Sequence, residues 1–228
     1  MKKKRILLAQ WTLFSFALLV MIFFTACRPA FERFQHLISE LRDNVFIAES
    51  ENYSVYILSG RREEPFIMDG HAGTMRDYTL ITLEPKTCLQ THTFKAVING
   101  TEYSGQFVAH PFAKSFSAEI AVAARGAHIA LTVLCGGTEE TLNAVSVLTE
   151  NMISAEKAVE IAEKKLRDSI DMFRANGTLQ CEIYVRLMAN PIDNSGGYYW
   201  YVAFIGANQT IFAVLIEPVT MQILAIRD

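Results

Sequence analysis

The sequence predicts an α+β protein with an N-terminal helix, a small antiparallel β-sandwich-like domain, and a second domain in which one helix lies on an antiparallel sheet. Three observations lead to this fold class. Apolar residues recur at helical spacing over residues 31–46, and short alternating patterns typical of strands follow over residues 53–135. A second helical pattern, starting at Ala155, then precedes four more strand patterns.

The first 27 residues have the pattern of an export signal. Residues 2–5 are KKKR, an apolar run follows over residues 6–26, and Cys27 comes directly after Thr25 and Ala26. Small residues before a cysteine resemble the lipobox of bacterial lipoproteins, although Phe24 stands where leucine is usual. We therefore expect residues 1–27 to be a lipoprotein signal peptide and Cys27 to carry the lipid, such as palmitate, that holds the protein at the extracytoplasmic face of the cell membrane.

An uncleaved transmembrane anchor is the alternative for the same segment. Its apolar run has 21 residues, and about 20 are enough to span a bilayer. In both cases the basic cluster stays inside and the rest of the chain lies outside the membrane.

The charge of the chain argues against a nucleic-acid partner. The formal net charge is −3, and removal of the four cations at residues 2–5 leaves −7. Beyond the leader there is no basic stripe of the kind that binds a polyanion. The partners expected from the sequence are the membrane, through the lipid anchor, and a protein or peptide.

Residues 28–50 are predicted to form an amphipathic helix that packs on the next domain. Its apolar residues recur every three or four positions, with charged residues between them. They are Phe31, Phe34, Leu37, Ile38, Leu41 and Val45.

Residues 51–150 have the pattern of an antiparallel β domain, which is Ig-like by pattern only. Six short segments alternate apolar and polar residues. They are residues 53–58, 78–83, 92–98, 102–108, 115–123 and 127–134. Asn99-Gly100, between the third and fourth segments, is a strong hairpin signal. Residues 139–147 have helical character.

Residues 151–228 are predicted to form the second domain. Ser154 is suited to cap a helix that starts at Ala155 and ends before Asn176-Gly177. Four strand patterns follow the helix. They are residues 179–187, 198–205, 210–216 and 223–226.

Three segments of this last domain resemble the PepSY family. They are ISAEKA at residues 153–158, YWYV at residues 199–202 and IEPVTMQIL at residues 216–224. They match the family's helix, Trp-x-Val strand and closing hairpin in order, over the last third of the chain. Glu217 and Met221 stand where the family has Asp and Gly. The resemblance implies a non-catalytic module that binds or inhibits peptidases or other envelope proteins.

The stretch over residues 59–73 combines charges, glycines and a histidine, and binding residues concentrate in such loops. It is interpreted first as a structured, solvated loop and next as a partner-binding surface. Its candidate binding residues are Arg61, Arg62, Asp69 and His71. A further alternative is an envelope hydrolase or a metal-binding protein that uses Asp69, His71 and Asp77.

Two other groups of residues are candidates for a role. Tyr199 and Tyr201 should share one face of a strand and are candidate partner-binding residues. Cys88 and Cys135 fall in one predicted domain, where an exported compartment would permit a disulfide that spacing alone does not require. Cys181 lies in an apolar strand pattern and is interpreted as a small buried hydrophobe.

The sequence favours a non-enzymatic cell-envelope lipoprotein that binds a protein or peptide partner. No catalytic set, cofactor motif or C-x-x-C metal motif is present in the chain. The alternatives are the hydrolase described above and a structural accessory subunit of a membrane complex.

Overall fold

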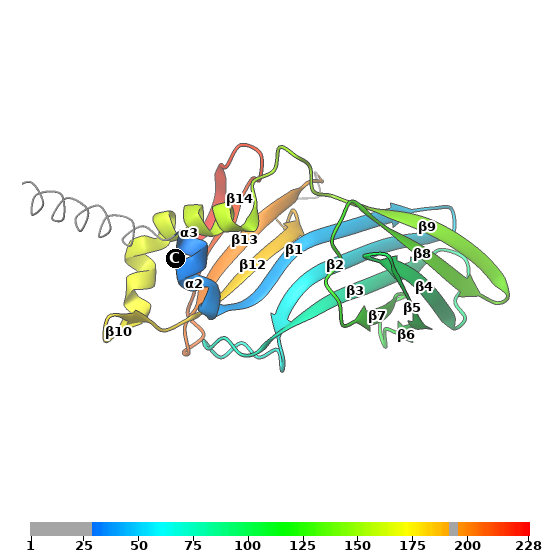
Figure 1. Ribbon diagram of the computed structural model, residues 1–228, viewed down its shortest axis with the longest axis horizontal. Helices are drawn as coiled ribbons and strands as arrows, with labels where there is room; N and C mark the ends of the chain where they lie inside the picture. Colours follow the sequence, from blue (N-terminus) through cyan, green and yellow to red (C-terminus); the bar gives the residue numbers. More distant parts are fainter. Residues whose placement is uncertain (1–28, 192–195) are drawn as a thin grey trace, which may run out of the picture.

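The computed structural model describes residues 29–191 and 196–228 (Figure 1). Of these residues, 52% lie in strands and 14% in helices. The helices are α2 (Ala30–Phe34), η1 (Gln35–Leu37), α3 (Ala155–Ile170) and η2 (Asp171–Phe173). The strands are β1 (Ile38–Glu49), β2 (Tyr53–Glu63), β3 (Met75–Pro85), β4 (His92–Ile98), β5 (Thr101–Gln106), β6 (Val108–Ala109), β7 (Phe116–Ile120), β8 (His128–Cys135), β9 (Thr138–Ser146), β10 (Arg174–Ala175), β11 (Thr178–Leu179), β12 (Glu182–Ala189), β13 (Tyr198–Ile205), β14 (Ile211–Ile216) and β15 (Ile223–Arg227).

Thirteen of these strands form one sheet, and the predicted α+β fold class is therefore wrong. The sheet runs in the order β15, β14, β13, β12, β1, β2, β3, β7, β6, and β9, β8, β4 and β5 continue it from β1. Within the described residues β1 and β12 pair in parallel, and the other strand pairs are antiparallel. Strands from both predicted domains thus hydrogen-bond through β1 into one mostly antiparallel β structure.

The predicted helix over residues 31–46 is also wrong beyond its first turns. Helix α2 ends at Phe34, and β1 begins at Ile38. The apolar spacing that suggested a helix is a consequence of an irregular strand, because β1 carries a bulge between Leu41 and Asn44 where it pairs with β2. Gly60 lies opposite this bulge, where a Cβ atom would come within 2.0 Å of the Leu41 carbonyl oxygen.

β1 and β2 supply alternate residues to two cores on opposite faces of the sheet. Val45 belongs to a core beneath α2 and α3, here called the helix-side core, and Phe46 belongs to a core enclosed by β2, β3, β4, β7, β8 and β9, here called the strand-side core. On β2, Ile57 lies in the strand-side core while Tyr56 and Leu58 pack against the helix-side core. The largest fully buried residues of the helix-side core are Leu166, Ile183, Trp200 and Phe204. Those of the strand-side core are Phe46, Ile57, Ile81, Leu83, Ile98, Ile129 and Leu131.

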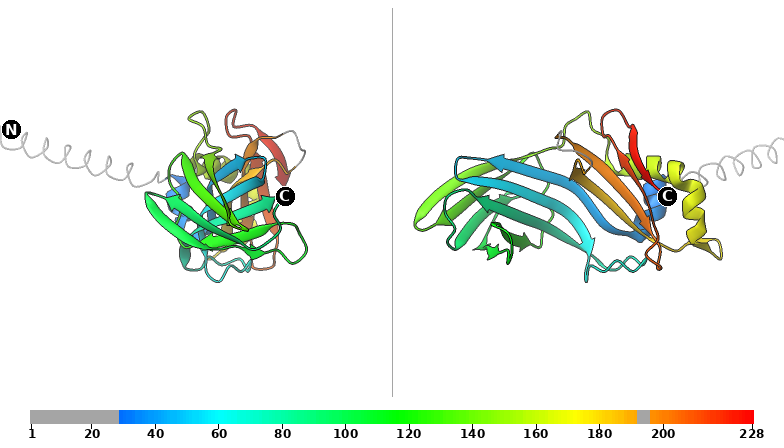
Figure 2. Two further views of the ribbon diagram at one scale, coloured as in Figure 1. Left: turned by 90° about the vertical axis from the view of Figure 1, so that its right-hand side faces the viewer. Right: turned by 180° about the vertical axis from the view of Figure 1, so that it is seen from behind.

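The two cores occupy opposite ends of the molecule. Helices α2 and α3 lie over one end of the sheet, and β4 to β9 gather at the other (Figure 1). The view from behind shows β1, β2 and β3 running from the helical end to the far end (Figure 2). The long strands are therefore covered by helices on one face near one end, and by other strands on the opposite face near the other end.

Helix α3 forms as its sequence predicts. The Ser154 hydroxyl accepts a hydrogen bond from the Lys157 N–H (3.4 Å), which caps the first turn. The side chains that face the sheet are all buried: Ala155, Ala158, Val159, Ala162, Leu166 and Ile170. The indole N–H of Trp200 on β13 donates to the Ile153 carbonyl oxygen (2.9 Å), so the start of the helix is tied to the sheet.

The tight turns follow their local sequence, and one predicted helical segment does not. Asn99 and Gly100 have positive φ angles of 52° and 80° and join β4 to β5. Residues 139–147, expected to be helical, instead form most of β9, which pairs with β8 through a turn at Gly136 and Gly137. A strand forms here because Leu142 and Ala144, two positions apart, both point into the strand-side core.

Candidate functional site

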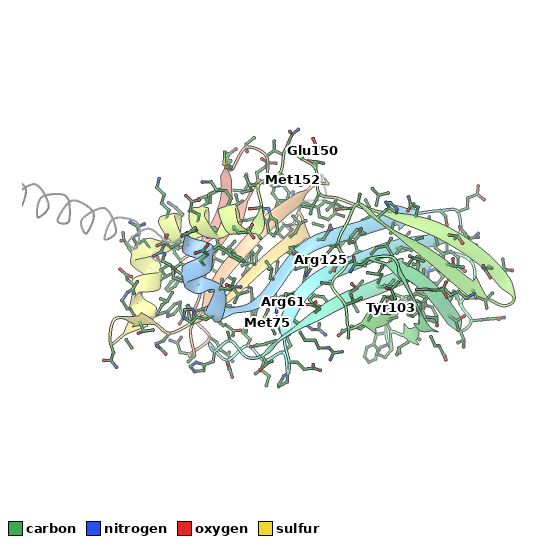
Figure 3. All side chains as sticks on the ribbon, in the orientation of Figure 1. Arg61, Met75, Tyr103, Arg125, Glu150 and Met152 are labelled. Atoms are coloured by element: carbon green, nitrogen blue, oxygen red, sulfur yellow. A yellow bond between two sulfur atoms is a disulfide. The ribbon has the colours of Figure 1, made fainter. Side chains whose placement is uncertain are left out.

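The loop over residues 64–74 connects β2 to β3 and is held by the side chain of Glu63. Figure 3 shows Arg61 and Met75 at the ends of the two strands from which the loop extends. The Glu63 carboxylate accepts backbone N–H groups from Ile67 (3.3 Å) and Gly73 (2.6 Å). Burial raises the pKa of Glu63, although these two hydrogen bonds act in the opposite direction.

A second buried glutamate fastens the tip of the loop to the sheet. Glu182, at the start of β12, is fully buried and accepts the Gly70 N–H (3.0 Å) and the Ser39 hydroxyl (2.6 Å). Gly70 has a φ of +84°, and a Cβ atom there would lie 2.3 Å from the Ala207 nitrogen in the β13–β14 turn. Glycine at position 70 therefore lets the loop lie directly on the sheet.

Glu40 is the third buried glutamate of this region, and it is neutralised by cations. Its carboxylate accepts hydrogen bonds from Arg42 (2.8 Å), Arg186 and the Tyr78 hydroxyl (3.1 Å). Burial, reinforced by Glu40, raises the pKa of Tyr78 to about 12. Burial lowers the pKa of Arg42, but Glu40 and Tyr78 raise it by more, so both partners keep their protons. This carboxylate is therefore held by three donors of the chain itself.

Aromatic rings and guanidinium groups close the space above these carboxylates. Phe66 stacks on Tyr184 with ring centroids 5.6 Å apart, and Arg186 lies over the Tyr184 ring at 4.2 Å. The Arg62 guanidinium lies over Tyr78 at 4.8 Å. A pocket of about 210 Å³ remains between the loop and the sheet, lined by Arg62, Glu63, Glu64, Pro65, Phe66, Arg76, Tyr78 and Glu119.

Of the four residues proposed from the predicted loop over residues 59–73, Arg61 and Arg62 lie in strand β2 instead, because the strand continues to Glu63, whereas Asp69 and His71 lie in the loop over residues 64–74. Arg61 pairs with Asp77 (3.1 Å) and Arg62 with Glu119 (2.6 Å). The Asp69 carboxylate accepts the His71 backbone N–H (3.0 Å) and so stabilises the turn. Within residues 29–191 and 196–228, Asp69, His71 and Asp77 do not form a cluster of potential metal ligands.

The two tyrosines proposed as a binding pair lie on β13. Trp200 between them is buried in the helix-side core. Tyr201 is half-buried and packs against Tyr184 and its neighbours on the opposite face, and Tyr199 is partly exposed near Gly197. Burial raises the pKa of Tyr201. Tyr201 therefore serves mainly to pack the sheet face beneath the loop.

A larger groove lies where the helix-side face of the long strands continues beyond α3. It has a volume of about 730 Å³ and is lined mostly by apolar surface of β1, β2, β3 and β9. Ile47 and Val145 are directly paired across β1 and β9, and they are 45% and 50% exposed. Tyr56 lines the same groove, and Glu49 and Glu84 supply carboxylates.

The groove residues were missed by reasoning from the sequence. Ile47 was placed in the predicted N-terminal helix and Val145 in a helical segment, whereas in strands β1 and β9 they face the same side. The signal available in the sequence was the alternation of Leu142 and Ala144 with the polar residues Thr141 and Asn143, which is typical of a strand. The pairing of β9 with β1 had no local signal, because the two segments are almost one hundred residues apart in sequence.

The cysteines form one disulfide within the described residues. Cys88 and Cys135 are bonded, with Cα atoms 6.6 Å apart, and they join the β3–β4 connection to the end of β8. Cys181 is a buried free thiol in the helix-side core, and burial raises its pKa to about 12. A thiol in this state is unreactive and acts as a small hydrophobe.

Comparison of the chain with protein-family models, with curated proteins and with solved structures found no match in any of the three. Across residues 29–191 and 196–228, none of the helices has both the length and the hydropathy needed to cross a membrane. The predicted signal peptide, lipobox and Cys27 lie outside the described residues.

Proposed function

We propose that this chain is a non-enzymatic cell-envelope lipoprotein that binds a protein or peptide partner in the groove formed by β1, β2, β3 and β9. One observation carries this proposal: Ile47 and Val145, a directly paired apolar couple, are half exposed in a groove of about 730 Å³. Exposed apolar surface gathered in a concavity is typical of an interaction site.

The lining of the groove defines the chemistry of the partner. Its centre is apolar, and the carboxylates of Glu49 and Glu84 lie among the lining residues. Glu49 is exposed and pairs with Lys86, so its charge is partly compensated, and Glu84 is also exposed. The groove therefore fits an apolar segment flanked by a lysine or arginine.

Two further observations support an extracytoplasmic location for this binding. The basic cluster, apolar run and Cys27 have the order of a lipoprotein leader. The disulfide between Cys88 and Cys135 is of a kind that persists mainly in oxidising compartments. The resemblance of residues 153–224 to PepSY modules adds an expectation of envelope binding partners.

The hydrolase alternative has less support. Asp77 is paired with Arg61, and Asp69 stabilises its own turn, so neither is presented toward a common point with His71. The accessory-subunit alternative uses the same groove, and the identity of the bound partner distinguishes it from the proposal.

Site-specific photo-crosslinking in intact cells tests the proposed binding. A photoreactive amino acid placed at Ile47 or Val145 of the full chain should yield an adduct with an envelope protein or peptide. The matched control is Val97 on β4, which is 41% exposed but lies outside the groove.

The pattern of crosslinked adducts distinguishes partner binding in the groove from nonspecific contact and from self-association. Adducts from positions 47 and 145, and none from position 97, would support the proposal. It would be overturned if position 47 gave no adduct, if all three positions gave the same adducts, or if the adduct were a second copy of this chain.

A further inference from the structure

His92 lies beside the disulfide as a result of the strand register. It is the first residue of β4 and is directly opposite Cys135, the last residue of β8. Cys88 precedes His92 by four residues and is bonded to Cys135. The short segment from Cys88 to His92 and the pairing of β4 with β8 therefore place two sulfur atoms and one imidazole side by side.

The surroundings of His92 do not account for a histidine at this position. Its side chain is fully buried, between the rings of Tyr53 and Phe116 at centroid distances of 5.7 and 4.6 Å. Among the described residues, neither ring nitrogen makes a hydrogen bond of good geometry. The backbone of Gln90 is near enough to oppose, in part, the lowering of the His92 pKa by burial. A buried polar group without a well-formed hydrogen bond destabilises the folded chain, whereas a phenylalanine would fill the same aromatic site without that penalty.

The three potential ligand atoms are within reach of one ion. The sulfur atoms of Cys88 and Cys135 are bonded to each other in this structure, and both lie within 4.8 Å of a ring nitrogen of His92. Zinc binds thiolates at about 2.3 Å and imidazole at about 2.0 Å, so ligands around one ion are separated by less than twice these lengths. We propose that, when the disulfide is reduced, Cys88, Cys135 and His92 bind one zinc-type divalent cation.

Conversion of the disulfide form to the metal-bound dithiol form needs an external dithiol reductant and the cation, and no other group of the protein. A dithiol reductant supplies two electrons and two protons, the S–S bond breaks to give two thiols, and the reductant becomes a disulfide. Binding of the cation displaces the two thiol protons into solvent, and His92 binds through a neutral ring nitrogen without losing a proton. Three protein ligands leave the fourth tetrahedral position for water.

The exchange preserves a link between the same two segments. The disulfide ties the β3–β4 connection to β8, and a cation held by the same residues would tie them in the reduced state. The reduced protein should therefore gain thermal stability as the cation is added, because the ion binds the folded chain alone.

Cobalt(II) is a suitable probe, because it replaces zinc and reports thiolate ligation by a charge-transfer absorption. The experiment uses the full chain in detergent with Cys27→Ala and Cys181→Ala, so that Cys88 and Cys135 are the remaining thiols. After reduction and removal of the reductant, one cobalt per chain should bind with thiolate absorption, and zinc should displace it. The oxidised chain should show neither effect.

Two variants test the role of the histidine. His92→Ala should weaken cobalt binding about tenfold or more, by comparison with the losses seen when supporting residues of metal sites are changed. His128→Ala, an exposed histidine at the start of β8, should leave it unchanged. Absence of thiolate absorption in the reduced chain, or equal affinity in both variants, would overturn the proposal. If His92→Ala does not fold, the proposal is still tested by comparing cobalt binding and thiolate absorption between the reduced and the oxidised chain.

Discussion

Buried ionisable side chains concentrate on the sheet face beneath the loop over residues 64–74. Glu40, Glu63 and Glu182 are each at most 3% exposed. Each carboxylate receives at least two hydrogen bonds, from backbone N–H groups, hydroxyls or arginines. A buried charge persists only when it is paired in this way, so these residues act as fixed anchors.

Tyr78→Phe should lower the free energy of unfolding by about 1.5–3 kcal/mol, the usual worth of a hydrogen bond to a charged group. The hydroxyl that this change removes donates to Glu40 and lies 3.4 Å from the Arg42 Nε. Urea unfolding measures the difference. Tyr103→Phe, on the partly exposed edge strand β5, should change stability by no more than about 0.5 kcal/mol.

The same variant has a defined pH dependence. Because folding raises the pKa of Tyr78 from 10.0 to about 12, the folded chain holds this proton more tightly than the unfolded chain. The stabilisation is complete below pH 10 and is lost as the pH rises toward 12. The difference between wild type and Tyr78→Phe should therefore shrink over this window, and a constant or growing difference would contradict the assignment.

Met221→Gly should stabilise the protein by about 0.5–1 kcal/mol. Met221 has a φ of +63° and is about half exposed, so it bears the left-handed strain that glycine avoids at little loss of packing. Met172→Gly is the matched control, because Met172 is 76% exposed in η2 without a positive φ and should be destabilised by the same substitution. Thermal unfolding measures both, and shifts of the same sign would refute the strain argument.

At the scale of elements, short-range signals predicted turns and caps and failed where pairing partners were distant. Ser154 caps α3, and Asn99-Gly100 joins β4 to β5, because both depend on residues only a few positions apart. β1 was misread as a helix because its bulge gives the apolar residues a spacing close to that of a helix. What makes it a strand is pairing with β2 and β12, and β12 lies about 140 residues away.

The loop over residues 64–74 could be recognised from its sequence, but its anchors could not. Glycines and charges predicted a structured loop over residues 59–73, but residues 59–63 belong to β2 and the loop begins at Glu64. Within it, Glu64 pairs with Arg76 and the Asp69 carboxylate accepts the His71 N–H. Glu63 and Glu182 had no distinguishing pattern in the sequence. Glu63 is the last residue of β2 and Glu182 the first of β12, and these strand ends come together only in the folded sheet. Their role in holding the loop is therefore visible only in the structure.

Glu182→Ala should release the tip of this loop. It leaves the Gly70 N–H and the Ser39 hydroxyl without their shared acceptor, at a cost of about 1–3 kcal/mol for each buried donor. Glu182→Gln keeps an acceptor oxygen and should cost less. Hydrogen exchange of the amides at residues 66–73 should accelerate in the Ala variant, and Glu64→Gln, at an exposed glutamate of the same loop, should leave the exchange unchanged. Unaltered exchange in Glu182→Ala would show that the loop is held by other contacts.

At the scale of the whole molecule, two cores share one set of long strands. Alternation along β1 and β2 sends successive residues to opposite faces, and each face is covered at a different end. The sequence predicted two separate domains, over residues 51–150 and 151–228. It could not show that one sheet serves both, since this depends on the parallel pairing of β1 with β12. The uncovered helix-side face beyond α3 is the groove proposed to bind a partner.

The location of the molecule can be tested independently of the groove. If residues 1–27 act as a lipoprotein signal peptide, cells expressing the full chain and supplied with a clickable palmitate analogue should label the wild-type protein at Cys27. Cys27→Ala should abolish the label and leave an uncleaved leader detectable by its greater mass. Cys181→Ala, at a thiol buried in the helix-side core, should label like wild type. Label that persists in Cys27→Ala, or its absence from wild type, would favour the uncleaved anchor, which places the sheet and its groove on the same side of the membrane.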